Sequence, residues 1–209
     1  MLAFSIWLTA VLLYGIFWRW YHNFRGPLTA DEIEHYLDAF AKQENSLADT
    51  SQLREFLEAD KGEEFVMLNL VELYSEKVIH PETQQPVSAV SLIRAYLTGF
   101  MPSLMARAGH PVYSGRKVGR YIDSKNPGEE MDWTMVGSMR YRSRRDLVDL
   151  ALDPRFLDTH AYKFLGMAAT YSFPTHPMGG LYLGPRIWVA MVLALLAASS
   201  HLLLLLIGA

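Results

Sequence analysis

The chain of 209 residues has one long apolar segment at each end, and these segments restrict its fold more than any other feature. The first, Leu2–Trp18, is apolar apart from three residues with hydroxyl groups. The second, Ile187–Ala209, contains no Asp, Glu, Lys or Arg. A helix needs about 20 apolar residues to cross a bilayer, and about 17 is the lower limit. We therefore expect two transmembrane helices that flank a polar central region.

Basic residues flank both apolar segments on the side of the central region. Arg19 and Arg25 follow the first segment, behind an aromatic belt, and Arg186 precedes the second. Such residues are enriched on the cytoplasmic side of a membrane. The first segment lacks the basic start and the small-residue cleavage site of a signal peptide. We expect an uncleaved anchor in the cell inner membrane, a cytoplasmic central domain and both termini outside.

His201 is the ionisable residue that this topology places at membrane depth. Such residues tend to bind ligands or partner helices. The alternative is a neutral imidazole that a neighbouring helix or the first anchor satisfies, and we favour it. The adjacent small residues 197–200 suit close helix packing.

Charge and composition exclude several classes of function. Residues 26–185 hold 16 of the 19 Lys and Arg but all 22 Asp and Glu, which argues against nucleic-acid binding. There are no cysteines, so disulfides and thiolate metal sites are impossible. His80, His110 and His176 lie beside prolines at spacings that make no metal site. We expect no metal.

The central region has the order of elements β-α-β-β-α-β. We expect strands at residues 65–73, 110–122, 133–142 and about 169–173, and helices that begin after Ser88 and Ser143. This order is typical of the ferredoxin-like fold, an α+β fold with a four-stranded antiparallel sheet. The expected organisation is an N-terminal anchor (1–25), a helical connector (26–62), the ferredoxin-like domain (63–175), a linker (176–185) and a C-terminal transmembrane helix (186–209).

Two polar residues lie where an apolar side chain is expected. Asn69 interrupts the apolar run Phe65–Leu73, and its amide needs partners because an unpaired buried amide costs about 1–3 kcal/mol. It either ties down neighbouring backbone or contacts a ligand. His160 lies on one helix face with Phe156 and Phe164, and we favour a structural role for it.

A basic cluster lies on the expected second and third strands. We expect these residues to contact anionic lipid headgroups or an anionic substrate. The alternative is that they are solvated side chains at the edges of the strands. The members of the cluster are Arg116, Lys117, Arg120, Arg140 and Arg142, with Arg144 and Arg145 next to them.

Three stretches of this region together resemble the dimeric α/β-barrel superfamily, in particular an uncharacterised subfamily of unknown function. They are Val66–Leu70, Ala108–Tyr113, and Met139–Arg145 running into Asp153–His160. The resemblance covers about residues 63–175 and implies a sheet face that pairs with another sheet. The transmembrane helices are additions to the subfamily's soluble form.

The superfamily also contains cofactor-independent and haem-degrading monooxygenases. By similarity, Asn69 and His160 fall at the Asn and iron-ligating His positions of the haem-degrading enzymes, and Tyr141 replaces their Trp. This departure weakens the haem hypothesis, because the bulky indole distorts the porphyrin in those enzymes.

Two functions follow as expectations. The first is a non-catalytic accessory or scaffolding subunit without a cofactor, docked to other membrane-protein subunits or to a second copy. The alternative is a monooxygenase-like enzyme that acts on a hydrophobic substrate or on haem, with Asn69, Tyr141 and His160 lining its pocket. A pocket that all three side chains reach would favour the enzyme.

Overall fold

The computed structural model describes residues 1–42, 50–126, 132–179 and 183–208. The chain forms two compact units. One combines residues 1–24 with 178–209, and the other comprises residues 25–177.

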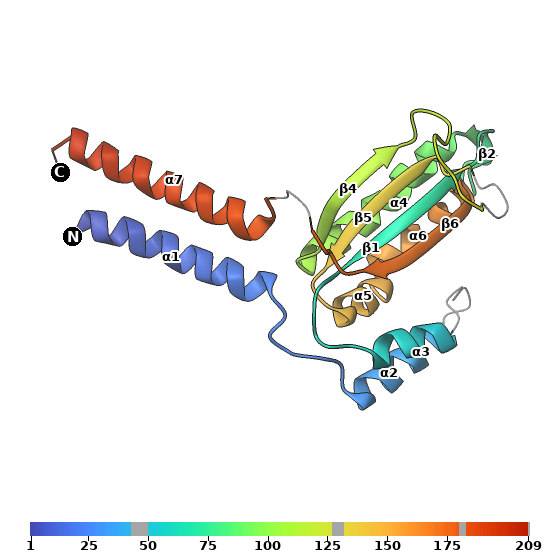
Figure 1. Ribbon diagram of the computed structural model, residues 1–209, viewed down its shortest axis with the longest axis horizontal. Helices are drawn as coiled ribbons and strands as arrows, with labels where there is room; N and C mark the ends of the chain where they lie inside the picture. The colour runs from blue at the N-terminus through green and yellow to red at the C-terminus, as the bar shows by residue number, and fades with distance from the viewer. Residues whose placement is uncertain (43–49, 127–131, 180–182, 209) are drawn as a thin grey trace. The chain divides into compact units, whose positions relative to one another are not determined.

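The larger unit is built on a four-stranded antiparallel sheet with the order β4-β5-β1-β6 (Figure 1). Its strands are β1 (Phe65–Leu73), β4 (His110–Arg116), β5 (Met135–Tyr141) and β6 (Met167–Thr175). The first strand in sequence is therefore central. Its Asn69 lies opposite Gly137 of β5 and Ser172 of β6, so these three residues share one face of the sheet.

Two helices, α4 (Ala89–Ala106) and α6 (Pro154–Gly166), lie against this face (Figure 1). The core between helices and sheet is largely aromatic: Phe65, Tyr96, Leu104 and Phe156 are among its buried members. Gly99 permits the close approach of α4 to α6, because a Cβ there would lie 2.0 Å from the carbonyl oxygen of Arg155. This packing holds α4 and α6 together as the layer that covers one face of the sheet.

A second cluster joins the N-terminal connector to the domain. Helices α2 (Ala30–Ala41) and α3 (Thr50–Glu58) pack against α5 (Arg144–Ala151), with Leu57 and Val148 at the centre of the contact. Thr29 and Glu32 form the capping box that the sequence predicts at the start of α2.

The caps of the two later helices also agree with the sequence. The Ser143 hydroxyl caps α5, and the Asp153 carboxylate caps α6, whose first residue is Pro154.

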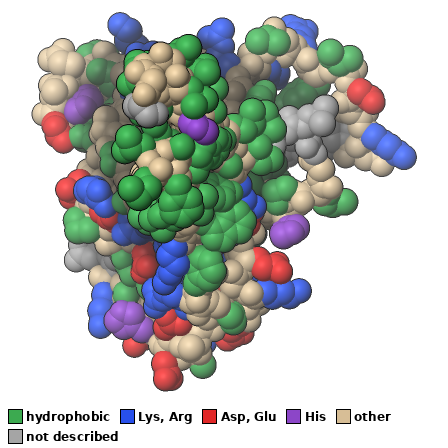
Figure 2. All heavy atoms as spheres, turned by 90° about the vertical axis from the view of Figure 1, so that its left-hand side faces the viewer, with side chains coloured by type: hydrophobic (Ala, Val, Ile, Leu, Met, Phe, Trp, Pro, Cys, Tyr) green, Lys and Arg blue, Asp and Glu red, His purple; other side chains and the backbone are tan. Residues whose placement is uncertain are grey.

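The smaller unit consists of two apolar helices, α1 (Leu2–Tyr21) and α7 (Pro185–Leu206), which pack antiparallel. The Trp7 indole donates a hydrogen bond to Nδ1 of His201 at 3.3 Å. His201 therefore contacts the first apolar helix, α1, as the favoured structural interpretation expects. Hydrophobic side chains gather over this unit (Figure 2).

Three described helices are long and apolar enough to cross a membrane: α1, α4 and α7. Helix α4 is 44% buried within its own domain, where it covers the sheet, whereas the apolar windows of α1 and α7 are 0% and 6% buried. The apolar residues of the two terminal helices are therefore largely exposed, whereas nearly half of those of α4 are buried within its domain.

Three predicted strands have other boundaries in the structure, and one of them, β5, spans Met135–Tyr141 rather than residues 133–142. Strand β4 ends at Arg116 rather than at residue 122, and β6 extends the predicted strand by two residues at each end. The segment expected to be a polar loop contains a short hairpin, β2 (Val78–Ile79) and β3 (Pro86–Val87). The predicted turn at 123–132 lies partly outside the described residues.

Candidate functional site

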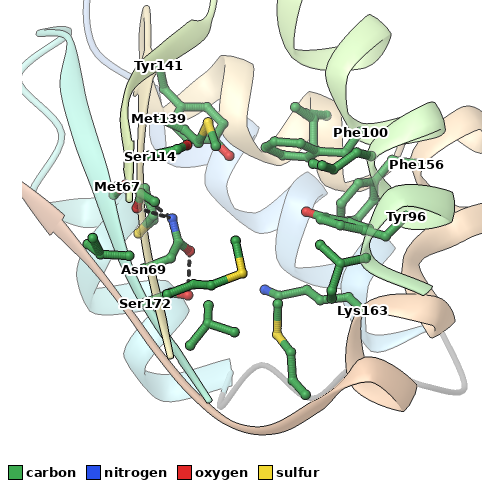
Figure 3. A pocket seen from close by; sticks show the side chains of 18 of the residues that line it. Met67, Asn69, Tyr96, Phe100, Ser114, Met139, Tyr141, Phe156, Lys163 and Ser172 are labelled. Atoms are coloured by element: carbon green, nitrogen blue, oxygen red, sulfur yellow. Dashed lines mark hydrogen bonds between the residues drawn. The ribbon is translucent and has the colours of Figure 1, made fainter. Parts of the chain in front are cut away.

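A cavity of about 250 Å³ lies between the sheet and helices α4, α5 and α6 (Figure 3). Its walls are mainly apolar, with methionines 67, 135, 139 and 167 on the sheet side and Phe100 and Phe156 on the helix side. The polar side chains at its lining are those of Asn69, Tyr96, Ser114, Tyr141, Lys163 and Ser172. A concave apolar site with a few polar groups is the usual form of a small-molecule site.

Asn69 lines this cavity, but its amide is occupied by neighbouring strands. Nδ2 donates to the carbonyl oxygens of Met67 (3.2 Å) and Gly137 (3.1 Å), and Oδ1 accepts from the Ser172 hydroxyl at 2.7 Å. Asn69 therefore links β1 to β5 and β6 at the cavity floor. Of the two roles that the sequence leaves open for Asn69, these hydrogen bonds are the contacts with neighbouring strands, and contact with a ligand stays a prediction.

Tyr141 also lines the cavity. Its ring stacks on Phe65 with centroids 5.3 Å apart and an interplanar angle of 9°. Burial raises the pKa of the Tyr141 hydroxyl above its usual value of 10, so the group remains a proton donor.

His160 is not among the residues that line the cavity. Its ring packs between Phe156 and Phe164, with centroid distances of 4.4 and 5.0 Å. Burial lowers the pKa of His160 to about 4, so the imidazole is neutral at pH 7. Asn69 and Tyr141 thus share a cavity that His160 does not join, and the predicted three-residue pocket is not assembled.

Of the polar side chains in the lining, the sequence analysis singled out only Asn69 and Tyr141, and it missed Tyr96, Lys163, Ser114 and Ser172. Lys163 follows Phe156 by seven residues, so the two share a helix face. Burial lowers the pKa of the Lys163 ammonium. A lysine at this spacing on a predicted buried face is the signal that could have identified it.

Tyr96 lies on the inward side of α4 together with Ile93 and Leu97, which also line the cavity. Val90, near the start of the helix, is 46% exposed, whereas Leu92 and Tyr96 are buried.

The predicted basic cluster does not form one exposed patch. Arg140 is buried, pairs with Glu64 and donates to the carbonyl oxygen of Ala108 at 2.6 Å. Arg142 pairs with Asp146 of α5. These two arginines therefore lie in internal ion pairs, because burying a cation without a partner is costly.

The remaining predicted members lie at or beyond the end of β4. Arg116 and Arg120 are exposed, and Lys117 pairs with Asp132. Arg145, next to the cluster, pairs with Glu32 and so fastens the connector to α5. The sequence did not reveal these pairings, since the partners are up to 113 residues away.

The opposite sheet face presents exposed aromatic side chains. Leu68 lies opposite Phe173, and Leu70 lies opposite Tyr171. Tyr113, Tyr171 and Phe173 are 59%, 61% and 43% exposed. Within residues 25–177, the described helices α4 and α6 lie on the other face (Figure 1). We call Leu68, Leu70, Tyr113, Tyr171 and Phe173 the open face.

The described residues contain no group of three or more His, Cys, Asp or Glu side chains able to hold a metal ion. The cavity lining includes no Asp, Glu or His. This lining can bind an apolar molecule with a polar head but provides no carboxylate or imidazole for proton transfer.

No protein-family model and no curated protein sequence matches the chain. Two solved structures of the RPA0582 protein are similar to it: one is of the methylated protein, and the other describes a protein of unknown function from Rhodopseudomonas palustris. Their TM-scores are 0.54 and 0.53, each at 18% sequence identity. They cover 65% and 64% of this chain and 96% of the RPA0582 chain. At this identity the likeness concerns the fold alone, an α+β domain.

Proposed function

We propose that residues 63–175 form a ferredoxin-like domain of the dimeric α/β-barrel superfamily. Two observations support this assignment. The elements β1, α4, β4, β5, α5 with α6, and β6 follow the βαββαβ order. The central position of β1, between β5 and β6, is compatible with that connectivity.

We propose further that the protein is a membrane-anchored accessory or scaffolding subunit that pairs with a second copy through the open face. The exposed aromatic residues on this face carry the proposal, because monomeric domains rarely expose a contiguous apolar patch. Antiparallel sheets can have one solvated face, but that face is then usually polar. Pairing two such faces would bury Tyr171 and Phe173 of both copies.

The test is purification of the full chain in mild detergent, with the mass of the protein part measured by light scattering. We expect a homodimer, and Phe173→Lys should convert it to a monomer because a lysine would be buried against an apolar face. Val90→Lys, on the exposed side of α4, is the matched control and should leave the dimer intact. A monomer without co-purifying subunits would contradict the proposal, whereas a stoichiometric heteromeric partner would replace the second copy.

The proposed topology spans the inner membrane with α1 and α7 and keeps residues 26–185 in the cytoplasm. Arg19, Arg25 and Arg186 support this orientation. Because the chain has no cysteine, single cysteines can report it directly. An impermeant maleimide applied to intact cells should label Gly208→Cys but not Glu76→Cys, and the opposite pattern would reverse the topology.

A monooxygenase-like enzyme is the second candidate, and the cavity with Asn69 and Tyr141 in its lining favours it. The position of His160 outside the lining gives no support to haem ligation at this site. An absorption spectrum of the purified protein tests the haem alternative, since a Soret band lost in His160→Ala would restore it.

A further inference from the structure

The polar groups of the cavity fall into two classes. Asn69 and Ser172 satisfy one another and the neighbouring backbone. In contrast, the Lys163 ammonium and the hydroxyls of Tyr96 and Tyr141 have no hydrogen-bond or carboxylate partner among the described residues, although Nζ of Lys163 lies 5.5 Å from the ring centroid of Phe164. Figure 3 shows all three groups pointing into the cavity, from α6, α4 and β5. Three elements thus bring three unsatisfied groups to one space.

These three groups are donors. An ammonium has three N–H donors and no acceptor, and a phenol donates one O–H. Burial raises the pKa of both tyrosines, which keeps their protons in place at pH 7. The complement of three converging donors, one of them cationic, is an anionic group with several lone pairs. A carboxylate, with about four lone-pair sites, meets this requirement.

The rest of the cavity specifies the body of the ligand. The walls are methionine, aliphatic and aromatic side chains, so the remaining part of the ligand is apolar. The cavity of about 250 Å³ is larger than the ~150 Å³ engineered cavity that holds benzene. By that comparison, it holds about ten non-hydrogen atoms.

We propose that this cavity binds an apolar carboxylic acid of about ten non-hydrogen atoms, with its carboxylate paired to Lys163 and hydrogen-bonded by Tyr96 and Tyr141. The ligand completes an otherwise uncompensated cation site in the domain interior. This proposal does not rest on the accessory role or on the dimer, since every residue that it uses belongs to one domain.

A carbonyl compound that forms an imine with Lys163 is the competing chemistry. Imine formation releases water and needs an acid to protonate the departing hydroxyl. The lining has no Asp, Glu or His, and its acids are two tyrosines whose pKa burial raises, so they are weak proton donors for this step. The carboxylate is therefore the better complement, and a covalent adduct is an outcome that would overturn the proposal.

The test is calorimetric titration of the full-length protein in a non-ionic detergent, with empty micelles as the blank. The probes are octanoate, 1-octanol and octylamine, which share a chain and differ in the head group. We expect one site per chain for octanoate and binding at least tenfold weaker for the other two. Equal binding of octanoate and octanol, tighter binding of octylamine, no binding, or adduct formation with octanal trapped by borohydride would each overturn the proposal.

Variants locate the site. Lys163→Met should weaken octanoate at least tenfold and leave octanol unchanged, whereas Lys42→Met, at the exposed end of α2, should change neither. Tyr141→Phe and Tyr96→Phe each remove one hydroxyl and should weaken octanoate a few-fold, which keeps the test valid if Lys163→Met fails to fold. Octanoate affinity that none of these substitutions alters would place the acid elsewhere.

A comparison of octanoate with a second carboxylate shows whether the acid comes from the bilayer or from solution. Octanoate represents an acyl chain from the bilayer, and 3-phenylpropanoate represents a water-soluble aromatic acid. Both require Lys163 under the proposal, and the tighter of the two identifies the source. A dimer that binds neither probe would leave the scaffold proposal intact while this one fails.

Discussion

The buried cations of this domain are of two kinds. Arg140 and Arg145 are each buried against a carboxylate from a distant part of the chain, Glu64 and Glu32 respectively. Lys163 lines the apolar cavity, where its Nζ lies 5.5 Å from the ring centroid of Phe164, and it has no carboxylate partner among the residues described. The arginine ion pairs join different elements of the domain. The lysine, in contrast, lines the cavity without a carboxylate partner. The difference separates residues that hold the architecture from a residue available to a ligand.

The largest expected effect comes from removing the Arg145 side chain. Arg145→Met breaks the pair with Glu32 and the hydrogen bonds to the carbonyl oxygens of Gly26 and Pro27. We expect a loss of about 3 kcal/mol of unfolding free energy, because Glu32 loses its buried partner and keeps only the exposed Arg25, while two backbone carbonyl oxygens lose their donor. Denaturant unfolding in micelles measures this loss. Arg54→Ala, which removes an exposed pair with Glu34, is the control and should have no measurable effect.

The same pair predicts an acid-sensitive stability. The hydrogen bond from Arg145 is the main cause that lowers the pKa of Glu32 from 4.5 to about 2. A lowered pKa in the folded state gives stability that is fully present above pH 4.5 and is lost as the pH falls towards 2. Glu32→Gln should flatten this part of the pH profile. An unchanged profile would show that other carboxylates dominate acid unfolding.

A smaller effect is expected at the cavity floor. Asn69→Ala removes the amide that joins β1 to β5 and β6, and we expect a loss of about 1–2 kcal/mol. Ser172→Ala removes one of these hydrogen bonds and should cost less. Thermal unfolding of both variants gives the ranking, and equal losses would mean that the amide acts only through Ser172.

The smallest change in unfolding free energy is predicted for substitution of Lys163, and here we expect no loss of stability. Lys163→Met replaces an unpaired, partly buried cation with an apolar side chain of similar length. Without ligand, stability should stay the same or rise by up to about 1 kcal/mol. A loss larger than that of Asn69→Ala would show that Lys163 is structural, like the arginines, and would remove the contrast between the two kinds of cation.

Much of the local structure follows from short-range sequence signals. Ser88, Thr29 and Ser143 begin helices because a hydroxyl there accepts a backbone N–H. Asp153–Pro154 restarts a helix, because proline has no N–H to lose at that position. The apolar run of β1 and the two terminal apolar helices were likewise predictable, since their hydrophobic patterns are long and nearly uninterrupted.

The candidate site was only half predictable, and the reason lies in tertiary packing. Asn69 and Tyr141 stand out in the sequence as polar groups on core strands, and both line the cavity. His160 stands out equally, yet it packs between Phe156 and Phe164, and Lys163 lines the cavity instead. His160 and Lys163 follow Phe156 by four and seven residues, so both lie near its helix face, and periodicity alone does not decide which of them lines the cavity.

The sequence by itself determined the membrane-compatible termini, the caps, and the order of strands and helices, because each depends on residues close together in the chain. Only the tertiary structure decided which arginines become internal pairs and where a cavity remains. Those outcomes depend on residues such as Glu32 and Arg145, or Tyr96 and Lys163, which are far apart in sequence and meet only when the helices pack on the sheet.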